Sequence, residues 1–232
     1  MVKDNNKGQQ DEVDKMNTVL FNTEHWIEKN QKAIIAIIII AIVVVVGFLA
    51  VRQFYFIPRE AKAQAEMFKG EMYLERDSFN LALNGNGADY IGFKAIADEY
   101  SFTKAGNLAK VYTGICYYNL GDNEEALKYF EEYSGDDAIL APNILAMMGN
   151  CYANLGKYDE AMDSFISAAD KSENDLTTPI FIKKAAVVAE KKGDYAKAVE
   201  LYQQIKDKYE NSYIGRDIDK YIERAKLNVV NK

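Results

Sequence analysis

The most hydrophobic part of the chain is a run from Ala33 to Val51, AIIAIIIIAIVVVVGFLAV, which contains no polar or charged side chain. A helix rises about 1.5 Å per residue, so about 20 apolar residues cross a hydrocarbon core roughly 30 Å thick. A soluble strand rarely exceeds about 10 residues, and a buried helix of this length without one polar position is rare. The run therefore predicts one transmembrane helix.

Basic and aromatic residues flank this run as expected for a membrane anchor. Basic side chains can reach a headgroup layer, and aromatic side chains concentrate at the two interfaces. The predicted anchoring side chains are Trp26 and Lys32 before the run and Arg52 and Tyr55 after it. A cleaved signal peptide has a shorter apolar core, of about 7–15 residues, that ends in a small-x-small site. We therefore expect an uncleaved span over residues 33–56.

The residues before the span form a polar N-terminal tail, 1–32. Residues 1–15 are polar and lack periodicity, which predicts disorder. Residues 16–32 interleave apolar and polar side chains, which is compatible with a short interfacial helix or with a loosely structured juxtamembrane tail. We expect the rest of the chain, 57–232, to form one domain.

That domain repeats a pattern of small and aromatic residues. Gly121, Gly156 and Gly193 are separated by 35 and 37 residues. Around each of them, a small residue lies seven positions before, an alanine five after and a large aromatic residue nine after. These residues are Gly114, Gly149 and Ala186, then Ala126, Ala161 and Ala198, then Phe130, Phe165 and Tyr202.

This spacing predicts helical hairpins. A glycine in the left-handed conformation ends the first helix, the small residue lets the second helix approach, and the aromatic residue fills the remaining gap. Pro142 and Pro179 fall at the start of a first helix, where a missing N–H does no harm. The pattern resembles the tetratricopeptide repeat, strongly in 107–174, with more degeneracy in 179–210 and weakly in 60–105.

The two ends of the domain depart from this pattern. Ala61–Glu75 and Tyr90–Tyr100 are predicted helices around the turn sequence NGNGAD at 84–89, which gives an imperfect first hairpin of the kind expected at the end of a solenoid. Ser212–Asn228 has apolar positions at helical spacing and predicts a C-terminal capping helix. The fold class is therefore all-α: one transmembrane helix followed by a tetratricopeptide-repeat helical solenoid.

Charge and composition exclude several functions. Residues 60–232 carry a net charge of −8 and residues 1–59 a net charge of +1, so nucleic acid is not an expected partner of the domain. The single histidine, His25, precedes the span, and the chain has no metal-ligand spacing, phosphate-binding loop or nucleophile elbow. We predict no catalytic, cofactor-binding or metal-binding residues, and no enzyme activity.

The two cysteines occupy equivalent positions in successive repeats. Cys116 and Cys151 lie 35 residues apart, each two residues after the small residue of its first helix. Equivalent positions on stacked helices lie about 8–10 Å apart, whereas a disulfide needs Cα atoms within about 7 Å. We expect two buried, free thiols.

In tetratricopeptide repeats the first helices line a concave groove, which implies a protein-binding surface here. Its expected residues follow the phase of the first helices and are Val111, Ile115, Tyr118, Asn119, Asn143, Asn150, Asn154, Lys183, Val187 and Lys191. Of its four asparagines, Asn143, Asn150 and Asn154 lie on one helical face, where they could hydrogen-bond an extended peptide or could be ordinary solvated positions. The basic residues of the family's carboxylate clamp are not reproduced, because Ala146 and Ile180 stand in their places.

The whole layout resembles the YfgM-type family of ancillary subunits of the bacterial Sec translocon. The residues that carry this resemblance are FIPREAKAQAEMFKGEMYLERDSFNLAL after the span and the repeats from Lys104 onward. The resemblance implies an inner-membrane protein with a cytoplasmic N-terminus and a periplasmic repeat domain. It implies partnership with the Sec translocon, with a PpiD-type membrane-anchored chaperone and with emerging secretory polypeptides, as a scaffold or co-chaperone.

The charges near the span leave its direction open, because basic residues flank both ends. They are Lys15, Lys29 and Lys32 on one side and Arg52, Arg59, Lys62 and Lys69 on the other. The alternative function is therefore an inner-membrane assembly scaffold with cytoplasm-facing repeats and no link to secretion.

Overall fold

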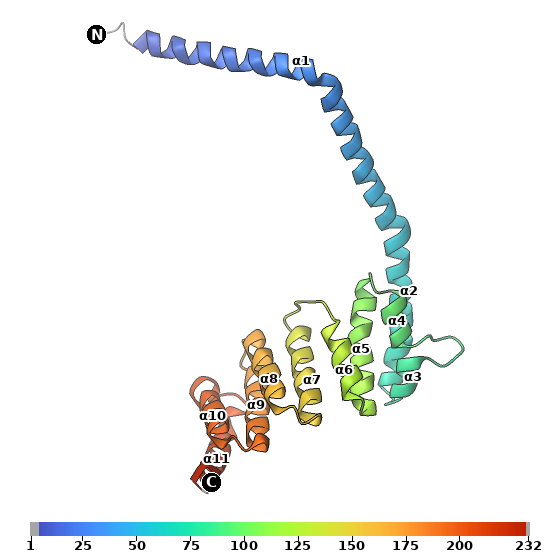
Figure 1. Cartoon of the computed structure of the whole chain (residues 1–232), viewed down its shortest axis with the longest axis vertical. Helices are drawn as coiled ribbons and strands as arrows, with labels where there is room; N and C mark the ends of the chain where they lie inside the picture. The colour runs from blue at the N-terminus through green and yellow to red at the C-terminus, as the bar shows by residue number, and fades with distance from the viewer. Residues whose placement is uncertain (1–4, 231–232) are drawn as a thin grey trace. The chain divides into compact units, whose positions relative to one another are not determined.

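The computed structural model describes the backbone of residues 5–230 and the side chains of Met16, Trp26 and 29–230. Within these residues all regular structure is helical. The chain divides into two compact units, Met1–Pro58 and Arg59–Lys232. Figure 1 shows the order of the helices along the chain.

The first unit is built on one long helix, α1 (Asn5–Val51), followed by the π-helical turn η1 (Arg52–Phe56). The helix begins at Asn5, which corrects the predicted disorder of residues 1–15; helix-compatible residues such as glutamine and glutamate fill this segment. Residues 1–4 and the side chain of His25 lie outside the described residues.

The apolar part of α1 is exposed to its surroundings along its whole length. Ile40 is 63% exposed and Phe48 67%, and the predicted anchoring side chains Trp26 and Tyr55 are also exposed. Lys32 and Arg52 are exposed too. By its length and composition this helix can cross a membrane.

The second unit is a row of consecutively packed helices, which confirms the predicted all-α solenoid (Figure 1). Its helices are α2 (Ile57–Leu74), α3 (Phe79–Asn84), α4 (Phe93–Glu99), α5 (Lys104–Leu120), α6 (Asn123–Glu131), α7 (Leu140–Asn154), α8 (Tyr158–Ser172), α9 (Thr178–Lys192), α10 (Tyr195–Tyr209) and α11 (Ile218–Val230). We name α5–α6, α7–α8 and α9–α10 hairpins 2, 3 and 4.

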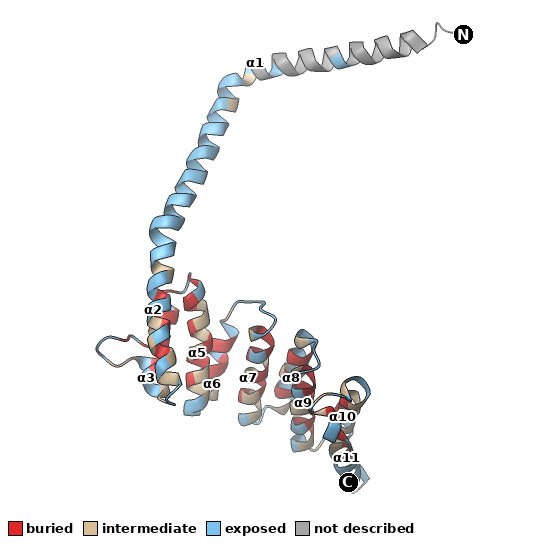
Figure 2. Ribbon diagram, turned by 180° about the vertical axis from the view of Figure 1, so that it is seen from behind, coloured by how far each residue is buried: buried red, intermediate tan, exposed pale blue. Residues whose placement is uncertain are grey.

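Each of these hairpins rests on the predicted close approach of its two helices. A Cβ atom added at Gly114 would lie 2.6 Å from the ring of Phe130, and one at Gly149 would lie 2.9 Å from the ring of Phe165. Both rings are 2% exposed. Burying such a side chain contributes about 1.5–3 kcal/mol. The buried residues accordingly concentrate between the helices (Figure 2).

The three glycines that end the first helices have the left-handed backbone that the spacing predicts. Their φ angles are +88° at Gly121, +74° at Gly156 and +85° at Gly193. At two of the three turns an aspartate then caps the second helix: Asp122 accepts a hydrogen bond from the N–H of Glu125 at 3.2 Å, and Asp194 accepts one from Lys197 at 3.0 Å.

Helices α2, α3 and α4 form a further hairpin with the same contacts, which we name hairpin 1. Gly70 of α2 faces the ring of Phe93, as Gly114 faces Phe130. Seven residues after Gly70, Asp77 has a φ of +52°, at the place that glycine occupies in the other hairpins. Five residues further on, Ala82 is fully buried, as are the repeat alanines.

An insertion in hairpin 1 lengthens the distance in sequence between its small residue and its aromatic residue, so the hairpin does not follow the repeat spacing. Its second helix breaks after Asn84 and resumes at Phe93, so 23 residues separate Gly70 from Phe93, whereas 16 separate Gly114 from Phe130. The hydroxyl of Tyr90 donates to the Ala82 carbonyl at 2.7 Å, and its ring stacks on Tyr73 at 5.5 Å. The insertion is thereby folded back into the core.

The C-terminal end is sealed as predicted, although the capping helix starts later than Ser212. Helix α11 follows a 3-10 turn, η2 (Gly215–Asp217), and buries three side chains against hairpin 4. These are Ile218, Ile222 and Ala225.

Both thiols are free and buried, in agreement with the sequence prediction. Burial raises the pKa of Cys116 to about 12 and that of Cys151 to about 11. Because the thiolate is the reactive form, both cysteines should be inert in the folded protein.

We predict that Gly70→Ala destabilises the repeat domain by about 1–3 kcal/mol, because the added methyl overlaps both the Tyr90 hydroxyl and the Phe93 ring and this cost exceeds the gain in helix propensity. Urea titration followed by circular dichroism measures the change. Met72→Ala on the same helix, 42% exposed, is the matched control and should change little. An equal loss for Gly70→Ala in a background that carries both Phe93→Leu and Tyr90→Phe would show that contact with these two side chains is not the cause.

Asp77→Gly should instead stabilise the protein by up to about 1 kcal/mol, because the left-handed conformation strains a residue with a Cβ atom. The same titration measures this gain. Glu132→Gly, at a helix end with a φ of −73°, is the control and should give no gain. A loss of stability at Asp77→Gly would contradict the assignment of hairpin 1.

The native cysteines should react with a thiol-specific reagent only as fast as the protein unfolds, because both thiols are buried and their raised pKa values keep them protonated in the folded protein. Absorbance of released thionitrobenzoate, with and without urea, measures this. A mobility shift on non-reducing gels that is reversed by reductant would instead reveal an internal disulfide.

Candidate functional site

The first helices of the four hairpins are α2, α5, α7 and α9. We name the surface formed by side chains at equivalent positions on these helices the first-helix face. Of the predicted groove residues, Asn119, Asn143, Asn154, Val187 and Lys191 are exposed on it. Ile115, Tyr118, Asn150 and Lys183 are half-buried. Val111 is 3% exposed and packs in the core with Phe130 and Ile144, which corrects its assignment as a ligand-contacting residue.

The first-helix face is hollowed between α2 and α5. The pocket has a volume of about 430 Å³, and Met67, Phe68 and Leu108 supply its apolar surface. Phe68 is 64% exposed. Glu60, Glu71 and Lys104 line its polar side.

The repeat spacing does not indicate this pocket, because the inserted residues put the first hairpin out of register with the others. Aligning Gly70 with Gly114 puts Gln64, Met67 and Glu71 at the positions of Leu108, Val111 and Ile115. This alignment is the signal that could have found the pocket. It extends the first-helix face by one hairpin toward the N-terminus.

Asparagines occupy the middle of the face, but they are not brought into contact with one another. The Asn150 side-chain oxygen accepts a hydrogen bond from the Lys184 ammonium at 3.0 Å. Asn154 donates to the Asn123 side chain at 3.0 Å, and Asn143 donates to the Ile139 carbonyl at 2.7 Å. A peptide that used these amides would have to share or replace these bonds.

The C-terminal end of the face is basic, although the domain as a whole is acidic. The ammonium of Lys183 donates to the Tyr221 hydroxyl at 3.1 Å and lies 4.2 Å from the centre of that ring. Lys220 and Arg224 approach the same ring at 5.3 and 5.1 Å. The hydrogen bond from Lys183 lowers the pKa of Tyr221.

The balance of charge therefore shifts along the face from more acidic to more basic residues, although Lys104 lies at the α2 end and Glu190 lies on α9. Glu60 and Glu71 lie at the α2 end, and Lys183, Lys184 and Lys191 lie on α9. Desolvation by burial lowers the pKa of Lys184, whose ammonium lies 5.4 Å from the Phe165 ring centre. Such a gradient can orient an extended ligand by its own charges.

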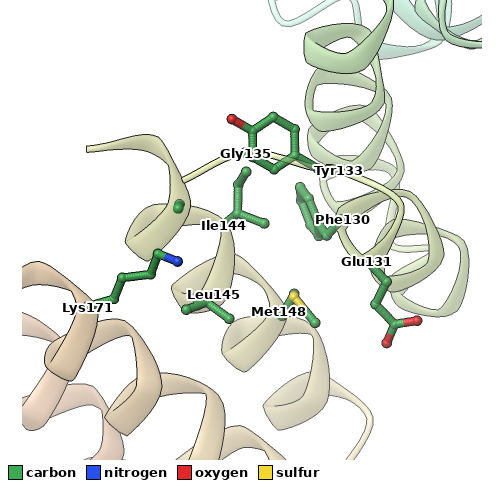
Figure 3. Close-up of a pocket in the computed structure, with 9 residues that line it drawn as sticks. Phe130, Glu131, Tyr133, Gly135, Ile144, Leu145, Met148 and Lys171 are labelled. Atoms are coloured by element: carbon green, nitrogen blue, oxygen red, sulfur yellow. The ribbon is translucent and has the colours of Figure 1, made fainter. Parts of the chain in front are cut away.

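A second apolar pocket, of about 330 Å³, lies between α6 and α7 and receives none of the predicted groove residues. Figure 3 shows Phe130 and Tyr133 on one side and Ile144 and Met148 of α7 on the other. Lys171 of α8 borders it. Among the described residues, no group of three or more His, Cys, Asp or Glu side chains could hold a metal ion.

Comparison with known proteins agrees with the repeat fold. A tetratricopeptide-repeat family model matches residues 108–135 and 184–212, and a second one matches 142–170. These segments fall on hairpins 2, 4 and 3. No curated protein matches the chain.

A solved structure described as the crystal structure of MamA is similar to 70% of this chain and to 95% of its own chain, with 15% sequence identity and a TM-score of 0.49. Three segments of the chain, on hairpins 2, 3 and 4, therefore match the tetratricopeptide repeat, a motif that indicates a scaffold for protein–protein interaction.

Proposed function

We propose that the protein is a single-span membrane scaffold or co-chaperone that binds partner proteins or emerging secretory segments beside the Sec translocon. The observation that carries this proposal is the direct succession of an exposed, membrane-length apolar helix and a domain that matches tetratricopeptide repeats. The resemblance to YfgM-type proteins supports a bacterial inner-membrane location, a periplasmic repeat domain and a PpiD-type chaperone as a further partner.

The first-helix face supports an extended polypeptide as the ligand. An apolar side chain would fill the pocket beside Phe68, and backbone groups would meet the asparagine amides of α7. Acidic residues of the ligand would lie near Lys183 and Lys191. Binding of this kind uses one apolar anchor and several modest polar contacts, which suits transient handling of many clients.

The alternative is a scaffold with cytoplasm-facing repeats and no link to secretion. It uses the same face and differs only in the side of the membrane. Reporter fusions at the C-terminus separate the two, because alkaline phosphatase is active only after export. An inactive phosphatase fusion with an active cytoplasmic reporter would reject the translocon proposal.

We predict that the tagged full chain, solubilised in a mild detergent, copurifies with Sec components. The double variant Lys183→Glu and Lys191→Glu should weaken client or partner recovery by roughly tenfold, because it reverses charge at the basic end of the face. Quantitative mass spectrometry of the eluates measures this.

The matched control reverses two lysines of second helices, Lys128→Glu and Lys208→Glu, and should leave recovery unchanged. Absence of every Sec component from the wild-type eluate counts against the translocon assignment. If the Lys183→Glu and Lys191→Glu variant and the control lose partner recovery equally, recovery depends on overall charge and not on the first-helix face.

A further inference from the structure

Four large apolar side chains recur along the repeat domain at an interval of 37 residues: Phe102, Ile139, Leu176 and Tyr213. They are 87%, 76%, 75% and 86% exposed. No other large apolar side chain between residues 59 and 226 is more than 64% exposed. We name these four residues the apolar edge row.

Each member lies in the turn that precedes a first helix or, for Tyr213, the capping segment. Hydrogen bonds hold these turns. Asp137 accepts from the N–H of Ile139 at 2.9 Å, and Asn174 accepts from that of Leu176 at 3.0 Å. The turn of Phe102 is closed by Thr103, whose hydroxyl donates to the Tyr100 carbonyl at 2.7 Å.

Ser212 makes the same bond beside Tyr213, to the Tyr209 carbonyl at 2.7 Å. The four side chains are therefore presented by ordered turns.

The opposite edge of the solenoid has a different character. The turns between the first and second helices place Asp122, Lys157 and Asp194 at the surface, and all three are exposed. Solvation alone gives no reason for one edge to carry the four most exposed apolar side chains of residues 59–226 while the other is charged.

The apolar edge is the edge from which α2 begins. Glu60, near the start of α2, accepts a hydrogen bond from the N–H of Lys104, the first residue of α5, at 2.7 Å. Asn107 then donates to the Ser134 carbonyl at 2.7 Å, which links α5 to the segment before Ile139.

Lys171, near the end of α8, forms an ion pair with Asp136 at 2.5 Å. The end of α8, which leads into the turn of Leu176, therefore lies beside the segment before Ile139. The edge is therefore continuous over hairpins 1 to 3.

The chain ties this edge to the end of the span. Phe54, Tyr55 and Phe56 close the apolar run and are exposed, as expected at a membrane interface. Arg59, the first residue of the repeat unit, follows Phe56 by three residues, which is about 4.5 Å of helix. An edge held so close to the interface meets the bilayer at a high effective concentration, so weak apolar contacts suffice.

We propose that the apolar edge row dips into the headgroup region of the bilayer that holds the span, so that the repeat domain lies on the membrane by this edge. This inference rests on the membrane anchoring proposed above. Small, spaced apolar insertions suit an interfacial contact better than a stable protein interface, which would bring them together in one patch.

The charged residues near the edge determine which lipid headgroups it should prefer. Lys104 and Arg216 lie near it, but so do Asp136, Asp137 and Asp175. Anionic headgroups would be repelled by these carboxylates. The contact should therefore be strongest on zwitterionic lipid and should weaken as anionic lipid is added.

The test uses the full chain in phosphatidylcholine liposomes, with single cysteines labelled by a fluorophore and nitroxide-labelled lipids as quenchers. The native thiols are buried and serve as the unlabelled background. Edge sites are Ile139→Cys and Leu176→Cys, and opposite-edge controls are Lys157→Cys and Asp194→Cys. Val44→Cys reports whether the span itself is inserted.

We expect quenching at the two edge sites to exceed that at the controls several-fold. Quenching at Ile139→Cys should fall when the other three members of the row are changed to serine. Those positions are exposed, so circular dichroism should show an unchanged fold.

Equal quenching at both edges with a quenched Val44→Cys would overturn the inference and leave the anchor intact. An unquenched Val44→Cys would overturn the anchor and the inference together. Edge quenching that disappears on dilution into excess lipid would show shielding by a second copy, and shielding only after addition of translocon proteins would show a protein partner. Both results would reject the lipid contact.

Discussion

The close approach of a small residue, glycine in hairpins 1 to 3 and Ala186 in hairpin 4, to an aromatic ring of the second helix is the constraint on which the repeat domain depends. Gly114 and Gly149 leave the space that Phe130 and Phe165 fill, and neither space would hold a Cβ atom without movement. The contact recurs at a spacing of 16 residues in hairpins 2 to 4, so the two helices of each hairpin meet at the same pair of positions. The stacking of hairpins, the common phase of the first helices and the two edges all follow from that repetition.

Repetition also gives the surface separate roles. The first helices carry the face whose charge runs from Glu60 to Lys191, and their preceding turns carry the apolar edge row. The second helices supply most of the aromatic residues of the core. A protein with no catalytic constellation can still be specific through such an arrangement, because a ligand must match several spaced contacts at once.

The sequence was sufficient for the parts of the fold that obey the repeat period. The hairpins at Gly121, Gly156 and Gly193, the membrane-length helix and the capping helix all follow from spacing and hydropathy. Hairpin 1 did not, because seven extra residues separate Gly70 from Phe93 and because Asp77 takes the left-handed position normally held by glycine. The pocket between α2 and α5 was not predicted for the same reason. Val111 was assigned to the groove although it packs in the core, because helical position alone does not distinguish a groove-lining residue from a buried one.

The insertion in hairpin 1 has a physical purpose that the repeat pattern does not express. A terminal hairpin lacks a preceding neighbour, so part of its apolar surface has nothing to pack against. The insertion adds packing within this hairpin: Tyr90 is 3% exposed, stacks on Tyr73 and satisfies a carbonyl of the broken helix. Helix α2 begins at Ile57, directly after the aromatic end of the span at Phe56, so the chain passes from the span into hairpin 1 without a loop.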